Sequence, residues 1–310
     1  MSLTRPIPVA LARVPGYDSP GLAQGVAQVL QASGFAPAPG TRVLVKPNLV
    51  SRRNATLSCT HPQVAVAACV WLLDRGAKPF VADSPAFGDV YGVARACGLD
   101  RALARINVPL TPLLAPRTLT TSFGQGIGVS AQALDAEVIL NLPKLKAHGQ
   151  MVMTGAVKNL FGLAVGFRKA LAHARWGEQG NRFEAAILDI LAACPSVHTL
   201  MDGVTAMHRD GPVGGDPCPL SLLAASPDPV AVDTAVYTLL GLTPARIPLW
   251  REALARNLPG AFPENLAYPL EQPTAFDGTL FEPPKRVLPV TFRPLRLVRG
   301  RIKSLLERWR

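Results

Sequence analysis

The chain has 310 residues, 48% of them apolar, and a net charge of +11. A chain of this length and composition can bury a substantial core, so we expect a folded protein. Residues 285–310 alone contribute +8, and the nearly neutral remainder argues against nucleic acid as the partner of the core. The five cysteines are widely spaced without a C-x-x-C pair, which argues against a disulfide framework and an iron–sulfur cluster in this chain and favours the cytoplasm.

Alternating strand and helix signals predict an α/β fold with a mostly parallel sheet and flanking helices. Short apolar runs predict strands at 42–46, 79–82, 137–141, 198–202 and 220–225. Capping residues and helical spacing predict helices at 60–74, 89–104, 183–193 and 229–240. These elements predict an α/β core domain over residues 1–284, with a division into two lobes as an open alternative.

Glycine and proline mark the expected breaks in this pattern. Gly98 interrupts the second helix, and residues 107–117 are expected to form a loop or an edge strand. The glycines between 124 and 128 favour a hairpin, and residues 203–219 favour an ordered loop over the site or a junction between lobes.

The last residues predict a basic C-terminal amphipathic helix, which we treat as a tail over residues 285–310. Its apolar residues recur at helical spacing: Leu295, Val298, Ile302, Leu305, Leu306 and Trp309. This helix could pack on the core, bind an anionic membrane surface, or bind a nucleic-acid or protein partner. No apolar run is long enough to cross a bilayer, so we expect a cytoplasmic protein that is at most peripheral to the membrane.

Polar side chains follow four of the predicted strands. In chain order they are Lys46 and Asn48, then Asp83 and Ser84, then Lys144, Lys146 and His148, and finally Asp202. In open α/β sheets, ligands bind at the carboxyl ends of the strands. We therefore expect these side chains to share one site.

The segment after the third strand carries the densest charge. If the chain stays extended, Lys144, Lys146 and His148 lie two residues apart and share one face. Two ammonium groups and an imidazole held together require an anion. That anion is either a carboxylate or phosphate ligand or an acidic residue of the protein itself. The alternative is a solvated loop with ordinary surface lysines.

The next segment resembles the start of a helix, with Thr154 as its cap. Lys158 would then lie near the positive end of the helix dipole, which is unfavourable for a cation. An anion bound by the backbone N–H groups would resolve the conflict, with Lys158 and Asn159 as further donors. A short irregular turn without a dipole is the alternative.

These patterns predict a cytoplasmic enzyme that acts on a small anionic metabolite and whose reaction class is unassigned. The expected ligand-binding side chains are Lys46, Asn48, Ser84, Lys144, Lys146, Lys158 and Asn159. The expected catalytic side chains are His148, Asp83 and Asp202. His148 is the acid/base candidate because an ordinary imidazole titrates near neutral pH. Either aspartate could orient it or hold a divalent cation.

Several segments, in order, resemble the domain-of-unknown-function family 362 over about residues 40–245. They are Val45–Leu49, Thr60–Pro62, Ala82–Pro85, Asn141–His148, Thr154–Gly162, Met201–Gly203, Asp210–Pro212 and Asp228–Asp233. Many members of that family carry a ferredoxin-type cysteine segment, so the resemblance implies a connection with electron transfer. This chain lacks that segment. The alternative function is therefore a non-catalytic redox accessory or ligand-binding protein that works with a separate iron–sulfur partner.

Overall fold

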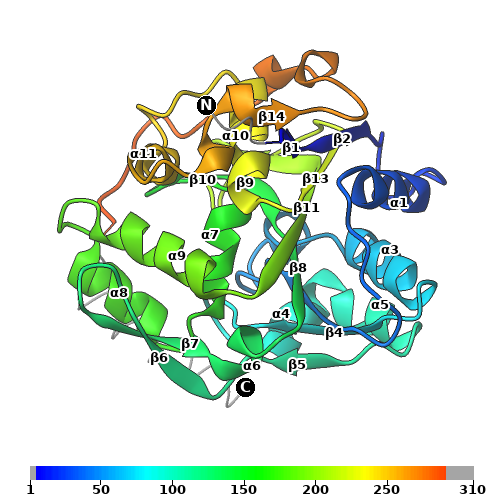
Figure 1. Ribbon diagram of the computed structural model, residues 1–310, viewed down its shortest axis with the longest axis horizontal. Helices are drawn as coiled ribbons and strands as arrows, with labels where there is room; N and C mark the ends of the chain where they lie inside the picture. The colour runs from blue at the N-terminus through cyan, green and yellow to red at the C-terminus, as the bar shows by residue number, and fades with distance from the viewer. Residues whose placement is uncertain (1–4, 291–310) are drawn as a thin grey trace.

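The computed structural model describes residues 5–290, and a ten-stranded sheet lies at its centre (Figure 1). Seven of its strands form the main row, in the order β10 (Val152–Thr154), β9 (Lys144–His148), β11 (Ser196–His208), β8 (Val138–Leu142), β3 (Arg42–Pro47), β4 (Lys78–Asp83) and β5 (Leu110–Pro112). From β9 to β5 all neighbours are parallel. Their carboxyl ends therefore share one edge, and the predicted mostly parallel sheet is confirmed.

The remaining strands lie beside β11 or form small sheets of their own. β13 (Leu222–Ser226) and β12 (Asp216–Cys218) pair with β11, and β2 (Ala10–Arg13) pairs with β13, all antiparallel. β6 (Pro116–Thr120) and β7 (Gly126–Ser130) form the hairpin that the glycines predict, and β1 (Ile7–Pro8) pairs with β14 (Leu266–Ala267).

Helices cover both faces of the sheet (Figure 1). On one face lie α1 (Leu22–Ala32), α3 (Pro62–Leu73), α4 (Val90–Cys97) and α5 (Leu99–Ala104). On the other lie α7 (Ala156–Leu160), α8 (Arg168–Trp176), α9 (Arg182–Ala193), α10 (Pro229–Leu239) and α11 (Pro248–Ala255). Three short helical turns complete the set: α2 (Ala55–Ser58) follows β3, α6 (Ala131–Leu134) follows β7, and the 3-10 helix η1 (Phe161–Leu163) follows α7.

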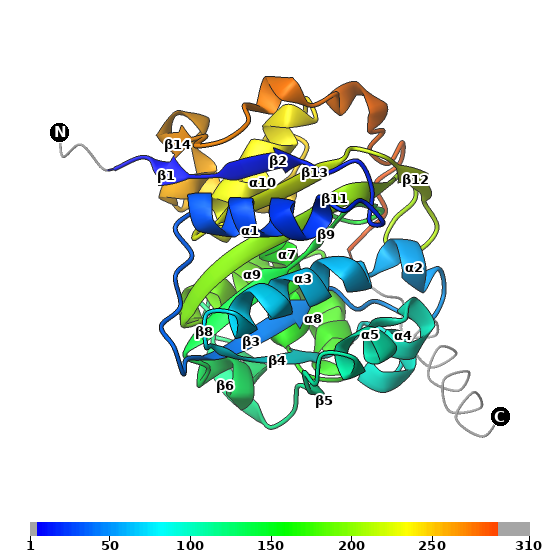
Figure 2. The ribbon, with the colours of Figure 1, turned by 90° about the vertical axis from the view of Figure 1, so that its right-hand side faces the viewer.

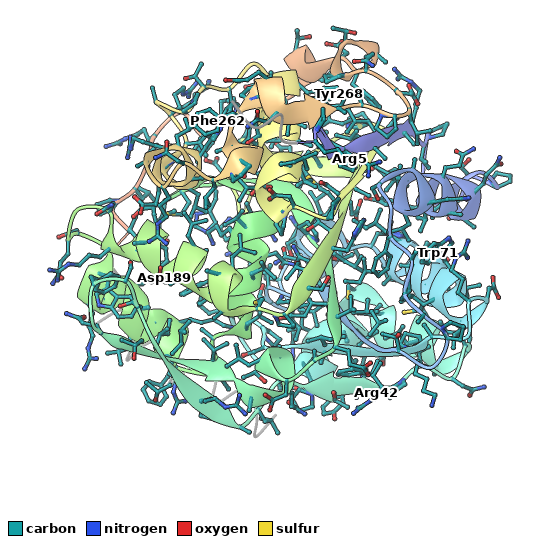
Figure 3. The ribbon with its side chains drawn as sticks, viewed as in Figure 1. Arg5, Arg42, Trp71, Asp189, Phe262 and Tyr268 are labelled. Carbon is teal, nitrogen blue, oxygen red and sulfur yellow. The ribbon has the colours of Figure 1, made fainter. Side chains whose placement is uncertain are left out.

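Two apolar clusters fill the space between sheet and helices. Alternate residues of β3 point to opposite clusters: Val43 packs under α1 and α3, whereas Leu44 packs on the other face. Trp71 of α3, which Figure 3 labels, stacks on Phe35 with ring centroids 5.6 Å apart. Asp189 of α9, also labelled in Figure 3, accepts a hydrogen bond from the Arg256 guanidinium at 2.7 Å. Burial on both faces explains the continuous apolar runs of these parallel strands.

β11 is longer than the sequence predicts. The predicted end at 202 is wrong because Gly203 does not break the strand: a Cβ there would meet the Leu222 oxygen at 3.0 Å. The residue is a glycine because a neighbouring strand approaches closely. β11 therefore continues to His208 and pairs first with β8 and then with β9 (Figure 2). The predicted loop over 203–219 contains the end of β11 and all of β12.

The C-terminal part of the described chain crosses the end of the sheet. The Leu288 N–H donates to the Gly149 oxygen at 2.6 Å, and the Gln150 amide donates to the Pro289 oxygen at 2.8 Å. The predicted amphipathic helix from Leu295 onward lies outside the described residues. Within residues 5–290, no helix combines the length and apolar character that crossing a membrane requires.

Candidate functional site

The carboxyl edge of the sheet carries a buried ion pair between neighbouring strands. Lys46 near the end of β3 and Asp83 at the end of β4 approach to 2.8 Å, and both are 1% exposed. The Asp83 carboxylate also accepts the N–H groups of Leu49 at 2.9 Å and Ser84 at 2.8 Å. Asp83 thus neutralises Lys46 and orders the loop after β3.

Three asparagines form a hydrogen-bonded chain across this edge. The Asn159 amide nitrogen donates to the Asn141 side-chain oxygen at 2.8 Å. The Asn159 oxygen accepts from the Asn48 amide at 2.8 Å and from Lys46 Nζ at 3.4 Å. The Asn48 oxygen in turn accepts from Lys146. Side chains from β3 and the residue after it, β8, β9 and α7 are therefore joined in one network, in which Lys46 and Asn48 lie together as expected from their positions at the strand end.

Lys146 is enclosed by polar groups but has no carboxylate partner within residues 5–290. Its ammonium donates to Asn48 and to the backbone oxygen of Ser58. Burial lowers the pKa of Lys146 to about 7, although the negative charge of the nearby Cys59 thiolate opposes this. The Cys97 side chain and the charge of Lys146 in turn hold the pKa of Cys59 below its usual value.

Lys144 lies apart from this network in a second buried ion pair. Its ammonium contacts the Asp202 carboxylate at 2.9 Å and donates to the Tyr17 hydroxyl. Asp202 also accepts from the Tyr17 hydroxyl at 2.8 Å and from the His61 N–H at 2.9 Å. The rings of Tyr17 and His61 stack 3.6 Å apart. An acidic residue of the protein therefore neutralises Lys144, which is the second of the two alternatives that the sequence left open.

The start of α7 differs from the sequence expectation. Gly155, and not Thr154, precedes the helix, and the Thr154 hydroxyl is buried without a partner among the described residues. The N–H groups of Ala156 and Val157 donate to the Asp233 carboxylate at 2.6 and 3.0 Å. The predicted binding of an external anion at these N–H groups is therefore wrong, because the protein supplies its own carboxylate there.

Lys158 and Lys169 complete the set of cations at this edge. Lys169 of α8 donates to the Ser84 hydroxyl at 3.1 Å and to the Pro85 oxygen at 3.3 Å. Lys158 of α7 is partly exposed and has no hydrogen-bond or ion-pair partner among residues 5–290. Burial lowers the pKa of Lys158 to about 8 and that of Lys169 to about 7. We refer to Lys46, Lys146, Lys158 and Lys169 as the lysine cluster.

His148 borders the lysine cluster as a neutral ring. Its Nδ1 accepts the N–H groups of Gln150 at 3.1 Å and Met151 at 3.2 Å, so the proton of the neutral ring lies on Nε2. Burial, followed by the charge of Lys158, lowers the pKa of His148 well below its usual value. Backbone groups rather than Asp83 or Asp202 orient the ring. At neutral pH it can donate a hydrogen bond but is a weak base.

Gly162 in η1 allows the Lys46–Asp83 pair to form. A Cβ at this position would lie 2.6 Å from Lys46 Nζ and 3.0 Å from the Asp83 oxygen. We expect Gly162→Ala to lower the free energy of unfolding by about 1–3 kcal/mol, because the pair must move apart. Urea denaturation measures the change, with Gly16→Ala as the control, since nothing lies within 4 Å of a Cβ at Gly16. Equal stability of the two variants would contradict this prediction.

Other parts of the described chain offer no comparable cluster. A surface hollow of about 230 Å³ lies between β6, β7 and α8, and Phe167, Arg168 and Arg175 are among its lining residues, but no residue of the lysine cluster lines it. Among residues 5–290, no three His, Cys, Asp or Glu side chains gather in a way that could hold a metal ion.

Sequence reasoning did not identify four side chains of this region: Tyr17, Lys169, His173 and Asp233. Tyr17 and Lys169 reach the site from elements outside the recognised strand ends, so no local pattern points to them. Asp233 stands within Asp228–Asp233, one of the segments that resemble the family, and that resemblance was the available signal. His173 Nδ1 lies 3.0 Å from the Val290 oxygen and connects α8 to the C-terminal segment.

Comparisons with known proteins give a family and one full-length relative. A thylakoid-associated protein of Synechocystis sp. is 35% identical over 308 residues, which cover 97% of this chain and 95% of the relative. Two solved structures resemble parts of the fold. The lactate racemase apoprotein of Thermoanaerobacterium thermosaccharolyticum has 11% identity and a TM-score of 0.44 over 62% of this chain and 50% of the other. A Thermotoga maritima protein has 14% identity and a TM-score of 0.38 over 64% and 53%.

The match to the family covers most of the sheet and its site. The pattern named "Domain of unknown function (DUF362)" matches residues 43–238. This range contains the lysine cluster, both buried ion pairs and the Asp233 carboxylate at the start of α7. Tyr17, which contacts the second ion pair, lies before it. The chain therefore belongs to the DUF362 family, as its ordered segments predict.

Proposed function

We propose that this protein is an enzyme that binds a small carboxylate or phosphate metabolite at the lysine cluster. One observation carries the proposal: Lys146, Lys158 and Lys169 lie at one edge of the sheet, and no carboxylate lies within 4 Å of any of them in residues 5–290. Burial is the main cause of the lowered pKa values of Lys146 and Lys169, and the charge of Lys158 lowers both further; a bound anion would relieve this repulsion.

The binding of inorganic phosphate and of succinate, measured by calorimetry, tests this proposal. We expect Lys158→Met to weaken binding of the preferred anion by roughly tenfold or more, because a charge-assisted contact contributes at least about 1.4 kcal/mol. Lys78→Met is the matched control, because Lys78 is an exposed lysine at the opposite end of β4. Equal affinity of the two variants would exclude the site. Native mass spectrometry of freshly purified protein identifies any acid that copurifies.

We further propose that the protein works in the cytoplasm at the surface of an anionic membrane. The relative named for its association with thylakoids supports this, as do the seven basic residues after Val290. The hollow beside α8 adds the exposed Phe167 ring and the charges of Arg175, which is exposed, and Arg168, which is partly exposed. His173, which contacts the Val290 oxygen, lies on the same helix.

Sedimentation with phosphatidylglycerol vesicles tests the membrane proposal. A chain ending at Val290 keeps every described contact of the C-terminal segment but loses the seven basic residues. We expect the full chain to sediment with these vesicles and the shortened chain to bind far more weakly, because each basic residue near such a surface contributes about 1 kcal/mol. Phosphatidylcholine vesicles are the control, and equal binding of both chains would refute the proposal.

A further inference from the structure

The hollow of about 230 Å³ beside α8 is formed by one stripe of that helix and one face of the β6–β7 hairpin (Figure 1). On the helix side, its lining residues follow helical spacing: Arg168, Leu171, Ala172, Arg175 and Trp176. Residues at this spacing lie on one side of a helix. The two arginines are seven residues apart, so their backbones lie about 10 Å from each other along the helix axis, with apolar residues between them.

Two glycines of β7 leave room for the hollow. Gly126 and Gly128 are two residues apart and line it together with Thr118, the partner of Gly128 in β6. A Cβ at Gly128 would lie 2.4 Å from the Cδ and Nε atoms of Arg168, so the arginine side chain occupies the space that the glycine leaves. The guanidinium carbon also lies 5.2 Å from the centre of the Phe167 ring. Contacts with both walls therefore position Arg168 in the hollow.

The lining combines positive charge with apolar surface. Leu171 is 36% exposed and lies between the two arginines on the helix. No aspartate or glutamate lines the hollow, and within residues 5–290 no carboxylate lies within 4 Å of either guanidinium. A guanidinium forms strong paired hydrogen bonds with a phosphate. The ligand that matches both properties is an anion with an apolar part.

The hollow shares its helix with the end of the described chain. His173 Nδ1 of α8 lies 3.0 Å from the Val290 oxygen, and seven basic residues follow Val290. The basic tail therefore begins beside the helix that lines the hollow. A single anionic surface of large extent, such as a membrane, can contact both.

We propose that this hollow binds the head group of an anionic phospholipid. The phosphate lies between Arg168 and Arg175 and accepts hydrogen bonds from both, and the first methylene groups of the acyl chains contact Leu171. The proposal rests on the membrane association proposed above. It names the lipid group that is recognised and the surface that the folded core contributes, in addition to the tail.

Sedimentation of the full chain with vesicles that mix phosphatidylcholine and phosphatidylglycerol tests the proposal. We expect Arg168→Gln with Arg175→Gln to weaken binding roughly tenfold or more, because two charge-assisted contacts are lost. The matched control is Arg101→Gln with Arg105→Gln, which removes the same charge from exposed positions on α5 and directly after it, on the other face of the sheet. We expect the control to keep the affinity of the natural chain. Equal affinities of the two double variants would overturn the proposal.

Gly128→Ala tests the geometry of the hollow without changing the net charge. The added Cβ displaces the Arg168 side chain, so we expect severalfold weaker binding to the same vesicles. The natural affinity in this variant would contradict the role assigned to Arg168. Circular dichroism confirms that each variant is folded.

Calorimetry distinguishes a lipid from a soluble phosphate. The probes are monomeric dihexanoylphosphatidylglycerol and glycerophosphoglycerol, which is the same head group without acyl chains. We expect the lipid to bind roughly tenfold more tightly or better, because its chains cover Leu171, and to lose this advantage in the Arg168 and Arg175 double variant. Equal binding of the two probes would overturn the lipid as the ligand.

The outcomes also separate this proposal from the membrane proposal on which it rests. Vesicle binding that depends on the tail but not on Arg168 and Arg175 would overturn the hollow as a lipid site and leave membrane association intact. A natural chain that does not bind phosphatidylglycerol vesicles would overturn both.

Discussion

Replacing Lys144 with methionine is expected to lower the free energy of unfolding by about 3–5 kcal/mol, because the substitution leaves the Asp202 charge buried without its cation. Both partners are at most 1% exposed, so water cannot replace the lost contact. Two hydrogen bonds to Asp202, from Tyr17 and the His61 N–H, remain but carry no full positive charge. The loss would be a large fraction of the stability of an ordinary domain.

The double variant Lys144→Met with Asp202→Asn is the control for this prediction. It removes both charges and keeps the shape, so we expect it to recover much of the stability that the single variant loses. Urea midpoints for the single and double variants measure the two effects. A single variant that loses less than about 1 kcal/mol would show that the pair is accessible to water, as surface pairs are.

A fall in pH from 7 to 5 is expected to destabilise the protein through its buried histidines. Burial lowers the pKa values of His173 and His198 to about 3, below the ordinary 6.5 of an unfolded chain. Between these values the unfolded state binds more protons, so stability falls as the pH falls. Each histidine contributes about 1.4 kcal/mol per pH unit, or about 2 kcal/mol at pH 5. The lowered pKa of His148 acts in the same direction.

His198→Gln isolates this effect from groups that oppose it. Burial raises the pKa of Asp233 to about 7, so its contribution to stability increases as the pH falls over the same range. His198 is distant from the lysine cluster and contacts Ser33 and the Phe35 ring. We expect the loss of stability between pH 7 and 5 to be about 2 kcal/mol smaller in the variant. Parallel pH curves for the variant and the natural chain would contradict the prediction.

The sequence predicts the central strands and the strand-end residues because those signals are local. Apolar runs around Val43 and Phe80 have the length of buried strands, and each is followed by a charged residue that a buried strand cannot contain without a partner. The alternation in Lys144, Lys146 and His148 is itself the pattern of an extended chain, and β9 has that conformation.

The partners of those residues could not be predicted, because they are far away in the sequence. Lys144 contacts Asp202, which is 58 residues away in the sequence, and Tyr17, which is 127 residues away. No element was predicted before residue 42, although β2 and α1 form there. Periodicity alone could not show whether a ligand or the protein neutralises each lysine. That distinction depends on the packing of β4, β11 and α10 against the site.

The asparagine chain leaves the site little freedom to adjust. If the Asn159 amide were rotated, its nitrogen would face two donors, Asn48 and Lys46, and its oxygen would face the Asn141 oxygen. Asn141 is itself held by the Ala156 oxygen and the Thr199 hydroxyl, deep in the sheet. The orientation of Lys46 and Lys146 is therefore set by a chain of amide side chains that begins at the buried Asn141 in the sheet. The donors of the proposed anion site are therefore already in place, and a ligand of the proposed class would select a geometry that exists before it arrives.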